Sequence, residues 1–200
     1  MSLYLGYGAG TVTRANDVSA EIDYSKVRFS DIKDANFVSK YSTINIEKSN
    51  DIKADSKYDR FDIDQVRDFK CSSKYGNIEI AQAQNVYALS KYTDFFVENI
   101  KSNIDFDLQY GSVKIENILK GFGEVRLVGK YTDYKINVQD GASYHLEAIA
   151  DYAGIKYPSN LNVTFEKDKG TYHEVEGHLG TANASSFIKA RLDYGGLRVQ

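Results

Sequence analysis

The sequence predicts an all-β chain wound into a single-stranded parallel β-solenoid, or β-helix, of about ten coils of 17–21 residues. Two observations predict this fold: tyrosines recur at a fixed interval, and apolar residues alternate on both sides of each tyrosine. The composition agrees, because 16 Tyr and 10 Phe with a single Pro favour strands over loops. We expect a right-handed winding, which parallel crossovers prefer.

The tyrosine interval defines the repeat. Six tyrosines follow one another 17 residues apart: Tyr7, Tyr24, Tyr41, Tyr58, Tyr75 and Tyr92. Later tyrosines continue at intervals of 18, 21, 21 and 42 residues: Tyr110, Tyr131, Tyr152 and Tyr194. Because one short strand cannot bury its apolar face alone, consecutive coils must stack with like positions in register.

Each coil contains two short strands, at positions 4–7 and 12–17 counted from its tyrosine. Positions 4, 6, 12 and 14 are apolar or small in nearly every coil, as in Ile44, Phe61 and Ile78 at position 4. This period-two alternation indicates strands with one buried face. Extending the alternation places each tyrosine at an inward corner, beside a hydroxyl ladder at position 16 formed by Ser39, Ser56, Ser73 and Ser90. The alternative is an exposed aromatic strip that binds sugar.

We expect one solenoid domain over residues 1–200. Its parts are regular coils at 1–152, an irregular segment at 153–187 and a final coil at 188–200. The irregular segment contains a predicted hairpin, Leu161–Phe165 with Tyr172–Val175, which we expect to cover one end of the rod. At the other end Leu3 and Leu5 already fit inward positions, so we expect further residues before Met1 in the natural precursor.

Composition excludes several function classes. The net charge of −3 gives no overall attraction to nucleic acid. A single cysteine, Cys71, cannot form an internal disulfide, and we expect it to be buried and inert. No Cys/His spacing is typical of structural zinc, and no apolar run reaches the roughly 20 residues of a membrane helix. We expect no cofactor, no metal and no transmembrane segment.

Two lysine columns are the candidate binding residues. Position 17 carries Lys40, Lys57, Lys74 and Lys91, and position 13 carries Lys53 and Lys70. Stacked like charges about 5 Å apart repel by roughly 1 kcal/mol per pair even in bulk water. An anionic polysaccharide or lipid headgroups would offset that repulsion. The alternative is that duplication of the repeat copied its surface charges, which keep the rod soluble.

An acidic stripe is predicted on the first strand of each coil, formed by Glu47, Asp62, Asp64, Glu79, Glu98 and Glu116. Toward the C-terminus the stripe changes to basic residues: Lys114, Lys135, Lys156 and Arg198. A calcium site here lacks any EF-hand or glycine-aspartate nonapeptide pattern, so a solvated surface is the favoured interpretation.

No catalytic residues are predicted. A polysaccharide-active β-helix enzyme requires carboxylates in a cleft formed by long loops, and Asp59, Asp62 and Asp64 lie in coils almost free of loops. His173, Glu174, Glu176 and His178 form a His/carboxylate cluster, but their spacing fits no metal motif and an ordinary hairpin surface is favoured.

The repeated unit resembles a known family. Lys40–Ile46 and Lys74–Ile80 share the pattern Lys-Tyr-Gly/Ser-x-Ile-x-Ile, and Asp193–Val199 resembles the last turn of bacterial adhesin-like proteins built from short β-strand repeats. The resemblance implies a bacterial secreted or envelope protein with a β-solenoid fold and without established catalytic residues.

We therefore expect a noncatalytic, adhesin-like binding or structural module, located outside the cell or in its envelope after removal of an N-terminal leader. Its expected partner is an acidic glycan or a surface protein, and not nucleic acid. The alternatives are a pectinase-like enzyme and a structural rod that self-assembles through its ends.

Overall fold

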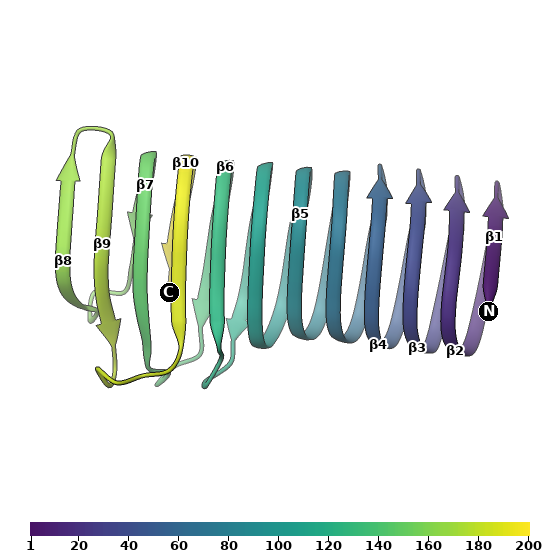
Figure 1. The fold of residues 1–200 in the computed structure, drawn as a ribbon, viewed down its shortest axis with the longest axis horizontal. Coiled ribbons are helices and arrows are strands. Elements are labelled where there is room, and N and C mark those ends of the chain that lie inside the picture. The colour runs from purple at the N-terminus through teal and green to yellow at the C-terminus, as the bar shows by residue number, and fades with distance from the viewer.

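The computed structural model describes the whole chain, Met1–Gln200, and confirms the parallel β-solenoid (Figure 1). The chain rises along the near face, crosses behind at the upper edge and descends along the far face while it advances from the N-terminus. This winding is right-handed. The near face carries positions 12–17 of each turn, and the far face carries positions 3–7.

Ten strands make up one sheet that continues around both faces. They are β1 (Ser2–Gly6), β2 (Ala9–Asp23), β3 (Lys26–Lys40), β4 (Thr43–Lys57), β5 (Arg60–Ile118), β6 (Glu124–Val138), β7 (Tyr144–Lys156), β8 (Asn162–Lys169), β9 (Tyr172–Leu179) and β10 (Phe187–Val199). Most strands bend around the lower edge, so that one element contains the far strand and the near strand of the same turn.

The register follows the 17-residue repeat. Ile44 of β4 pairs with Phe61 of β5, and Ile52 pairs with Phe69, each 17 residues further along the chain. Of the 157 hydrogen bonds between backbone groups, 137 lie within strands, so the ladders between turns hold the rod together. Like positions therefore lie directly above one another along the axis.

The interior is one continuous apolar core. Buried side chains at positions 4, 6, 12 and 14, together with others such as Ile32 and Ile100 at position 9, form a single cluster of 49 residues. Ile44, Phe61 and Ile78 are at most 1% exposed, which confirms the dry column predicted for position 4. Burial of each such side chain contributes roughly 1.5–3 kcal/mol. The core needs neither a disulfide nor a metal, because every added turn extends it.

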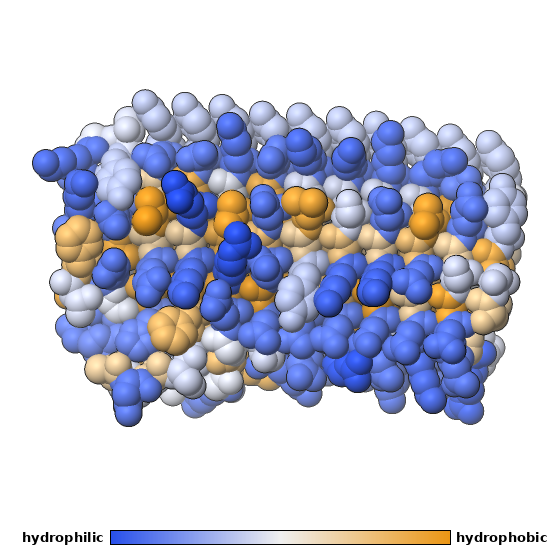
Figure 2. Space-filling model, viewed as in Figure 1, coloured by the Kyte–Doolittle hydropathy of each residue, from blue (hydrophilic) through white to orange (hydrophobic).

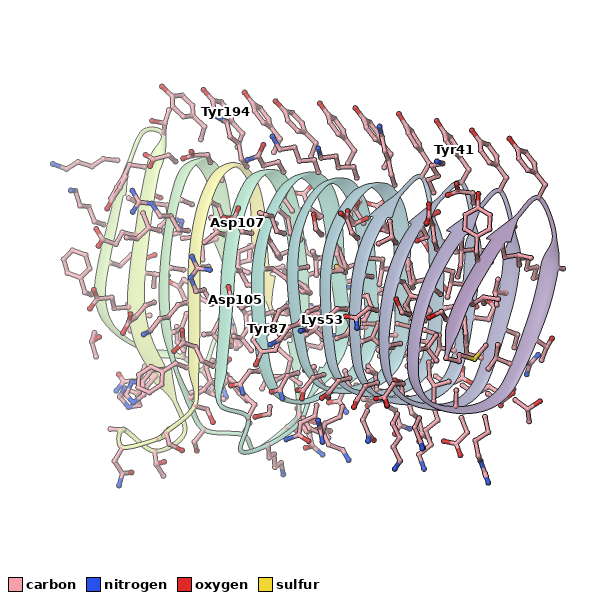
Figure 3. The ribbon with its side chains drawn as sticks, turned by 45° about the vertical axis from the view of Figure 1, so that its right-hand side comes forward. Tyr41, Lys53, Tyr87, Asp105, Asp107 and Tyr194 are labelled. Carbon is pink, nitrogen blue, oxygen red and sulfur yellow. The ribbon has the colours of Figure 1, made fainter.

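The tyrosines lie at the upper corner, but they point outward, so the prediction of an inward corner was wrong. All ten have a left-handed backbone with φ between 49° and 60°, and their side chains are 40–81% exposed. A positive φ interrupts the period-two alternation, so positions 17 and 1 both face solvent. Figure 3 shows these side chains projecting in a row along the upper edge, with Tyr41 and Tyr194 labelled.

The tyrosine rings stack on one another along the whole rod. Consecutive ring centres are 4.7–5.0 Å apart and the ring planes differ by 1–11°. Each left-handed residue costs roughly 1–2 kcal/mol, and each aromatic pair contributes roughly 0.5–1.5 kcal/mol. Stacking therefore offsets much of the backbone strain at the corner.

Polar groups fill the corner beneath the tyrosine ladder. The serines at position 16 are buried, as predicted, and Ser56 Oγ donates to Ser73 Oγ at 3.0 Å. At position 2 the Ser25 and Ser42 hydroxyls accept hydrogen bonds from backbone N–H groups of the preceding turn. Gly111 occupies the same position because a Cβ there would lie 2.3 Å from the carbonyl oxygen of Thr93.

Asp59 is the one buried carboxylate of the corner. It accepts three hydrogen bonds, from Ser39 Oγ at 2.8 Å, from the Ser42 N–H at 2.7 Å and from the Lys57 N–H at 3.0 Å. Burial raises the pKa of Asp59 above its usual range, although these three donors favour the ionised form. The Asp59 carboxylate therefore serves as the acceptor for hydrogen-bond donors on two neighbouring turns.

The last turn in chain order is not last in space. The spatial order at this end is β6-β10-β7-β9-β8, and β10 is parallel to both β6 and β7. The ring of Tyr194 accordingly stacks between those of Tyr131 and Tyr152, at 4.7 and 4.9 Å. Gly129 leaves room for this turn, because a Cβ there would lie 2.9 Å from Leu192.

The interval of 42 residues between Tyr152 and Tyr194 now has a physical explanation. After β7 the chain leaves the solenoid to form the antiparallel hairpin β8–β9, which confirms the predicted hairpin. β9 pairs antiparallel with the near-face part of β7, so the hairpin extends the near face and lies at that end of the rod, as expected (Figure 1). The chain then returns to fill the gap that it left between β6 and β7. At the opposite end β1 has β2 as its single neighbour.

Ring stacking predicts a graded effect of tyrosine removal. Tyr75 and Tyr7 have the same φ of 58°, but Tyr75 stacks on two rings and Tyr7 on one. We expect Tyr75→Ala to lower the free energy of unfolding by roughly 1–3 kcal/mol and Tyr7→Ala by about half as much. Urea denaturation measures both losses, and equal losses would contradict a stabilising role for the stack.

The buried carboxylate predicts a specific loss of stability. Asp59→Ala leaves three donors without an acceptor, so we expect a loss of roughly 2–4 kcal/mol, against less than about 0.5 kcal/mol for the exposed control Asp64→Ala. Thermal and urea unfolding of the three proteins test this difference. A loss equal to that of the control would show that solvent satisfies the donors.

The raised pKa of Asp59 also predicts a pH dependence. Because the folded pKa lies above the unfolded value of about 3.9, the stabilisation is complete below that value and declines as pH rises through the folded pKa. The difference in stability between wild type and Asp59→Ala should therefore be larger at about pH 3.5 than at about pH 7. Unfolding measured across this range would contradict the assignment if the difference grew with pH.

Candidate functional site

Outward positions form columns, and the candidate sites lie along them. The near face presents positions 13, 15 and 17, and the far face presents positions 3, 5 and 7. Figure 2 shows the near face as rows of hydrophilic side chains interrupted by apolar ones, with the paler tyrosine row along the upper edge. A repeated surface of this kind suits a partner that is itself extended.

The lysine column at position 17 runs directly beside the tyrosine ladder. Its members Lys40, Lys57, Lys74 and Lys91 are all exposed, and the first three are paired in register. Lys40 forms an ion pair with Asp23 at 3.0 Å, and this carboxylate raises the pKa of Lys40. Lys57 Nζ lies 5.6 Å from the centre of the Tyr58 ring. Lys57, Lys74 and Lys91 take part in no ion pair.

The second pair of predicted lysines, Lys53 and Lys70, lines a shallow groove on the near face. The groove has a volume of about 630 Å³, and its floor is formed by small side chains at position 14: Ala54, Cys71 and Ala88. Lys70 Nζ lies 5.1 Å from the centre of the Tyr87 ring. Figure 3 labels Lys53, Tyr87, Asp105 and Asp107 along this face.

The sequence did not single out several other residues of the groove, among them Tyr87, Asp105 and Asp107. Burial, followed by the nearby charges of Asp68 and Asp105, raises the pKa of the Tyr87 hydroxyl, which keeps it a hydrogen-bond donor. Asp105 is held in an ion pair with Arg126. The signal in the sequence was the departure of position 13 from lysine, since Tyr87 and Asp105 follow Lys53 and Lys70 in that column. The groove therefore combines cations, carboxylates and one aromatic ring.

The tyrosine ladder is exposed but offers few ring faces. Because each ring lies 4.7–5.0 Å from the next and nearly parallel to it, neighbouring tyrosines cover one another's faces. Sugar rings and nucleic-acid bases bind to aromatic faces, so the ladder presents ring edges and hydroxyl groups instead. The alternative prediction of an aromatic strip is correct in that the tyrosine rings are exposed. Their faces are covered by neighbouring rings, so they lack the surface that a sugar ring needs for stacking.

Half of the acidic stripe of the far face is neutralised by ion pairs. Glu47 pairs with Arg28, Glu79 pairs with Arg60 at 2.9 Å, and Glu116 pairs with Lys114. The pair with Arg28 holds the pKa of Glu47 below its usual range. No group of three or more His, Cys, Asp or Glu side chains in the structure is arranged to hold a metal ion.

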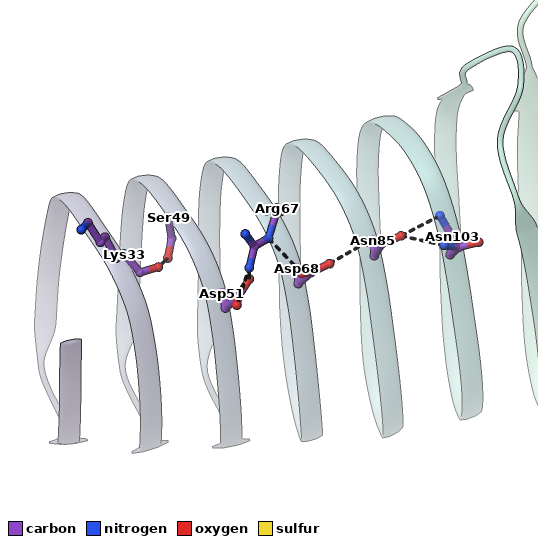
Figure 4. A network of polar contacts seen from close by, with 7 residues as sticks. All are labelled: Lys33, Ser49, Asp51, Arg67, Asp68, Asn85 and Asn103. Carbon is purple, nitrogen blue, oxygen red and sulfur yellow. Dashed lines mark hydrogen bonds and ion pairs between the residues drawn. The ribbon is translucent and has the colours of Figure 1, made fainter. Parts of the chain in front are cut away.

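A polar network follows part of the rod from turn to turn (Figure 4). Arg67 donates to both carboxylate oxygens of Asp51 at 2.6 Å and to Asp68 at 3.1 Å. Asn85 donates to Asp68 at 2.6 Å and accepts from Asn103 at 2.9 Å. Partial burial works to raise the pKa of Asp68, but its hydrogen bonds outweigh burial and lower it. These side chains bind one another, so the network connects turns rather than forming an open site.

The other residues that the sequence suggested for catalysis or metal binding do not come together in one site. Asp59 is buried in the corner, whereas Asp62 and Asp64 lie on the far face, so the three carboxylates do not converge. On the hairpin, His173 contacts Glu166 at 3.1 Å and His178 contacts Asn162 at 3.2 Å. Cys71 is buried, and burial raises the pKa of its thiol.

Comparison with known proteins adds no assignment to this geometry. No protein-family model, no curated protein and no solved structure matches the chain. The structure contains no helix of a length and hydropathy able to cross a lipid bilayer. The structure shows that the chain is a repeat protein with a β-solenoid fold.

Proposed function

We propose that this protein is a noncatalytic, adhesin-like binding rod that engages an acidic glycan along its lysine column at the cell surface. Of the four lysines in this column, Lys57, Lys74 and Lys91 are the proposed binding residues, because Lys40 is already paired with Asp23. The surface location rests on the resemblance of the Lys-Tyr units to adhesin-like repeats, and the ligand class rests on charge.

The observation that carries the proposal is a cation repeated in register without a neutralising partner. Lys57 and Lys74 are directly paired, and parallel turns lie about 4.8 Å apart. None of the three lysines forms an ion pair, so their mutual repulsion is unrelieved within the chain. A linear polymer with an acid group on each residue would place one negative charge near each lysine and remove that repulsion.

Removal of these charges should weaken glycan binding. We expect the triple variant Lys57→Gln, Lys74→Gln, Lys91→Gln to bind acidic polysaccharides roughly tenfold more weakly, since three exposed pairs of about 0.2–1 kcal/mol each contribute about 0.6–3 kcal/mol together. Binding of the wild type should fall steeply as salt rises. A glycan array followed by calorimetry at two salt concentrations provides both measurements.

The matched control removes the same charge elsewhere on the rod, by Lys101→Gln, Lys120→Gln and Lys169→Gln at exposed positions. The proposal requires the control to retain wild-type affinity. Absent binding, binding insensitive to salt, or equal losses in both triple variants would each contradict it.

Self-assembly through the ends is a second candidate, favoured by the open edge of β1. This strand pairs on one side alone, and the neighbouring Tyr7 is 81% exposed, with one ring face uncovered. A second copy would continue both the backbone ladder and the ring stack. Light scattering should then show oligomers that grow with concentration and are reduced by Tyr4→Lys on the edge strand. A monomer at all concentrations would exclude this function.

A further inference from the structure

A column of four cations lies on the far face near the C-terminal end. Lys114 pairs in register with Lys135, Lys135 with Arg198, and Arg198 with Lys156. In chain order Arg198 comes last, but in space it lies between Lys135 and Lys156. Three of the cations follow the repeat on consecutive turns, and the insertion of β10 between β6 and β7 adds Arg198 among them.

These cations have little compensation within the chain. Lys114 pairs with Glu116, whereas Lys135, Arg198 and Lys156 take part in no ion pair. Asp133 is the single carboxylate that lines the surface beside them. Because parallel turns lie about 4.8 Å apart, neighbouring cations repel one another unless an anion binds between them.

The column borders a groove with room for a ligand. The groove has a volume of about 460 Å³ and follows the same four turns. Its position-3 residues at the C-terminal end are Gly154 and Gly196, and a Cβ built at Gly154 would meet no atom within 4 Å. Because glycine has no side chain, the backbone at Gly154 and Gly196 is accessible directly beside Lys156 and Arg198.

Copying of the repeat does not by itself explain this column. Position 5 in the four preceding turns is occupied by Asn45, Asp62, Glu79 and Phe96, so the positive charge begins only at Lys114. Duplication places like charges on consecutive turns of the chain, which accounts for Lys114, Lys135 and Lys156 but not for Arg198. Arg198 instead reaches its place after an excursion through the hairpin β8–β9, which separates it from Lys156 along the chain.

We propose that this groove is a second binding site, distinct from the lysine column, for a short acidic oligosaccharide with carboxylate or sulfate groups on consecutive residues. The acid groups bind between Lys135, Arg198 and Lys156, and the sugar rings lie over Gly196 and Gly154. Nucleic acid is disfavoured because the faces of the nearby tyrosines cover one another and leave no platform for bases.

Ligand binding at this site also holds the C-terminal turn in place. One ligand contacts β6, β10 and β7 together, so it stabilises the inserted position of β10 relative to any opened form. The backbone amides of Leu197 and Val199 should exchange their hydrogens more slowly when the site is occupied. No such protection is expected for the strands of the near-face lysine column.

The test uses the full chain and four hexasaccharide or oligonucleotide probes: a hexamer of galacturonate, a sulfated hexamer, a neutral glucose hexamer and a single-stranded DNA hexamer. Calorimetry at low salt should show binding of at least one acidic sugar and no binding of the neutral hexamer. Arg198→Gln and Lys135→Gln should each reduce its affinity roughly tenfold or more, because a hydrogen bond to a charged group contributes about 1.5–3 kcal/mol.

The controls are Lys101→Gln and Lys169→Gln, which remove the same charge at exposed positions outside the groove and outside the lysine column, and should leave the affinity for the hexamer unchanged. Equal losses in both pairs of variants would overturn the site, as would unchanged exchange of the β10 amides on binding. Tighter binding of the DNA hexamer would overturn the ligand class. Loss of hexamer binding in the triple variant of the lysine column, with unchanged binding in Arg198→Gln and Lys135→Gln, would support the lysine column and contradict this groove, so the two proposals fail separately.

Discussion

Every turn of this protein forms a backbone ladder with the next, in parallel and in register, and the other features depend on that ladder. The spacing of about 4.8 Å brings each side chain into contact with its equivalents above and below. Apolar positions therefore form continuous columns, of which Ile44, Phe61 and Ile78 are an example at most 1% exposed. The same spacing stacks tyrosine rings at 4.7–5.0 Å and places lysines beside lysines. One constraint thus stabilises the interior and concentrates charge on the surface.

The upper corner shows how the turns are connected without loops. A left-handed tyrosine reverses the chain direction, and the strain is offset by stacking outside and by hydrogen bonds inside. Asp59 replaces the usual small residue and accepts from three donors, which explains why a carboxylate is found in the interior. Glycine takes this position where the carbonyl oxygen of Thr93 approaches closely, as at Gly111. The corner is therefore a structural unit, and its exposed rings are a consequence of it.

The surface offers repeated charges rather than a deep cleft, and this favours binding over catalysis as the proposed role. The lysine column, the near-face groove with Lys53 and Lys70, and the far-face cations differ in origin. The first two follow the repeat, whereas the last combines lysines of consecutive turns with Arg198, which the insertion of β10 between β6 and β7 places among them. A strand that returns to an earlier place in the stack can bring together charges that are far apart in the chain. Such a device gives a repetitive rod one locally distinct surface.

The interval of the tyrosines and the alternation of apolar residues sufficed to predict the parallel solenoid, its core columns, the buried serine ladder and the hairpin β8–β9. These features depend on local periodicity, which is readable along the chain. The direction of the tyrosine rings was not readable, because it depends on a positive φ that tyrosine rarely adopts. The place of β10 was not readable either, since the repeat at Tyr194 fits any turn of the stack equally well. Only the tertiary structure decided that β10 fills the gap between β6 and β7. There both edges of β10 form backbone hydrogen bonds, one edge with β6 and the other with β7.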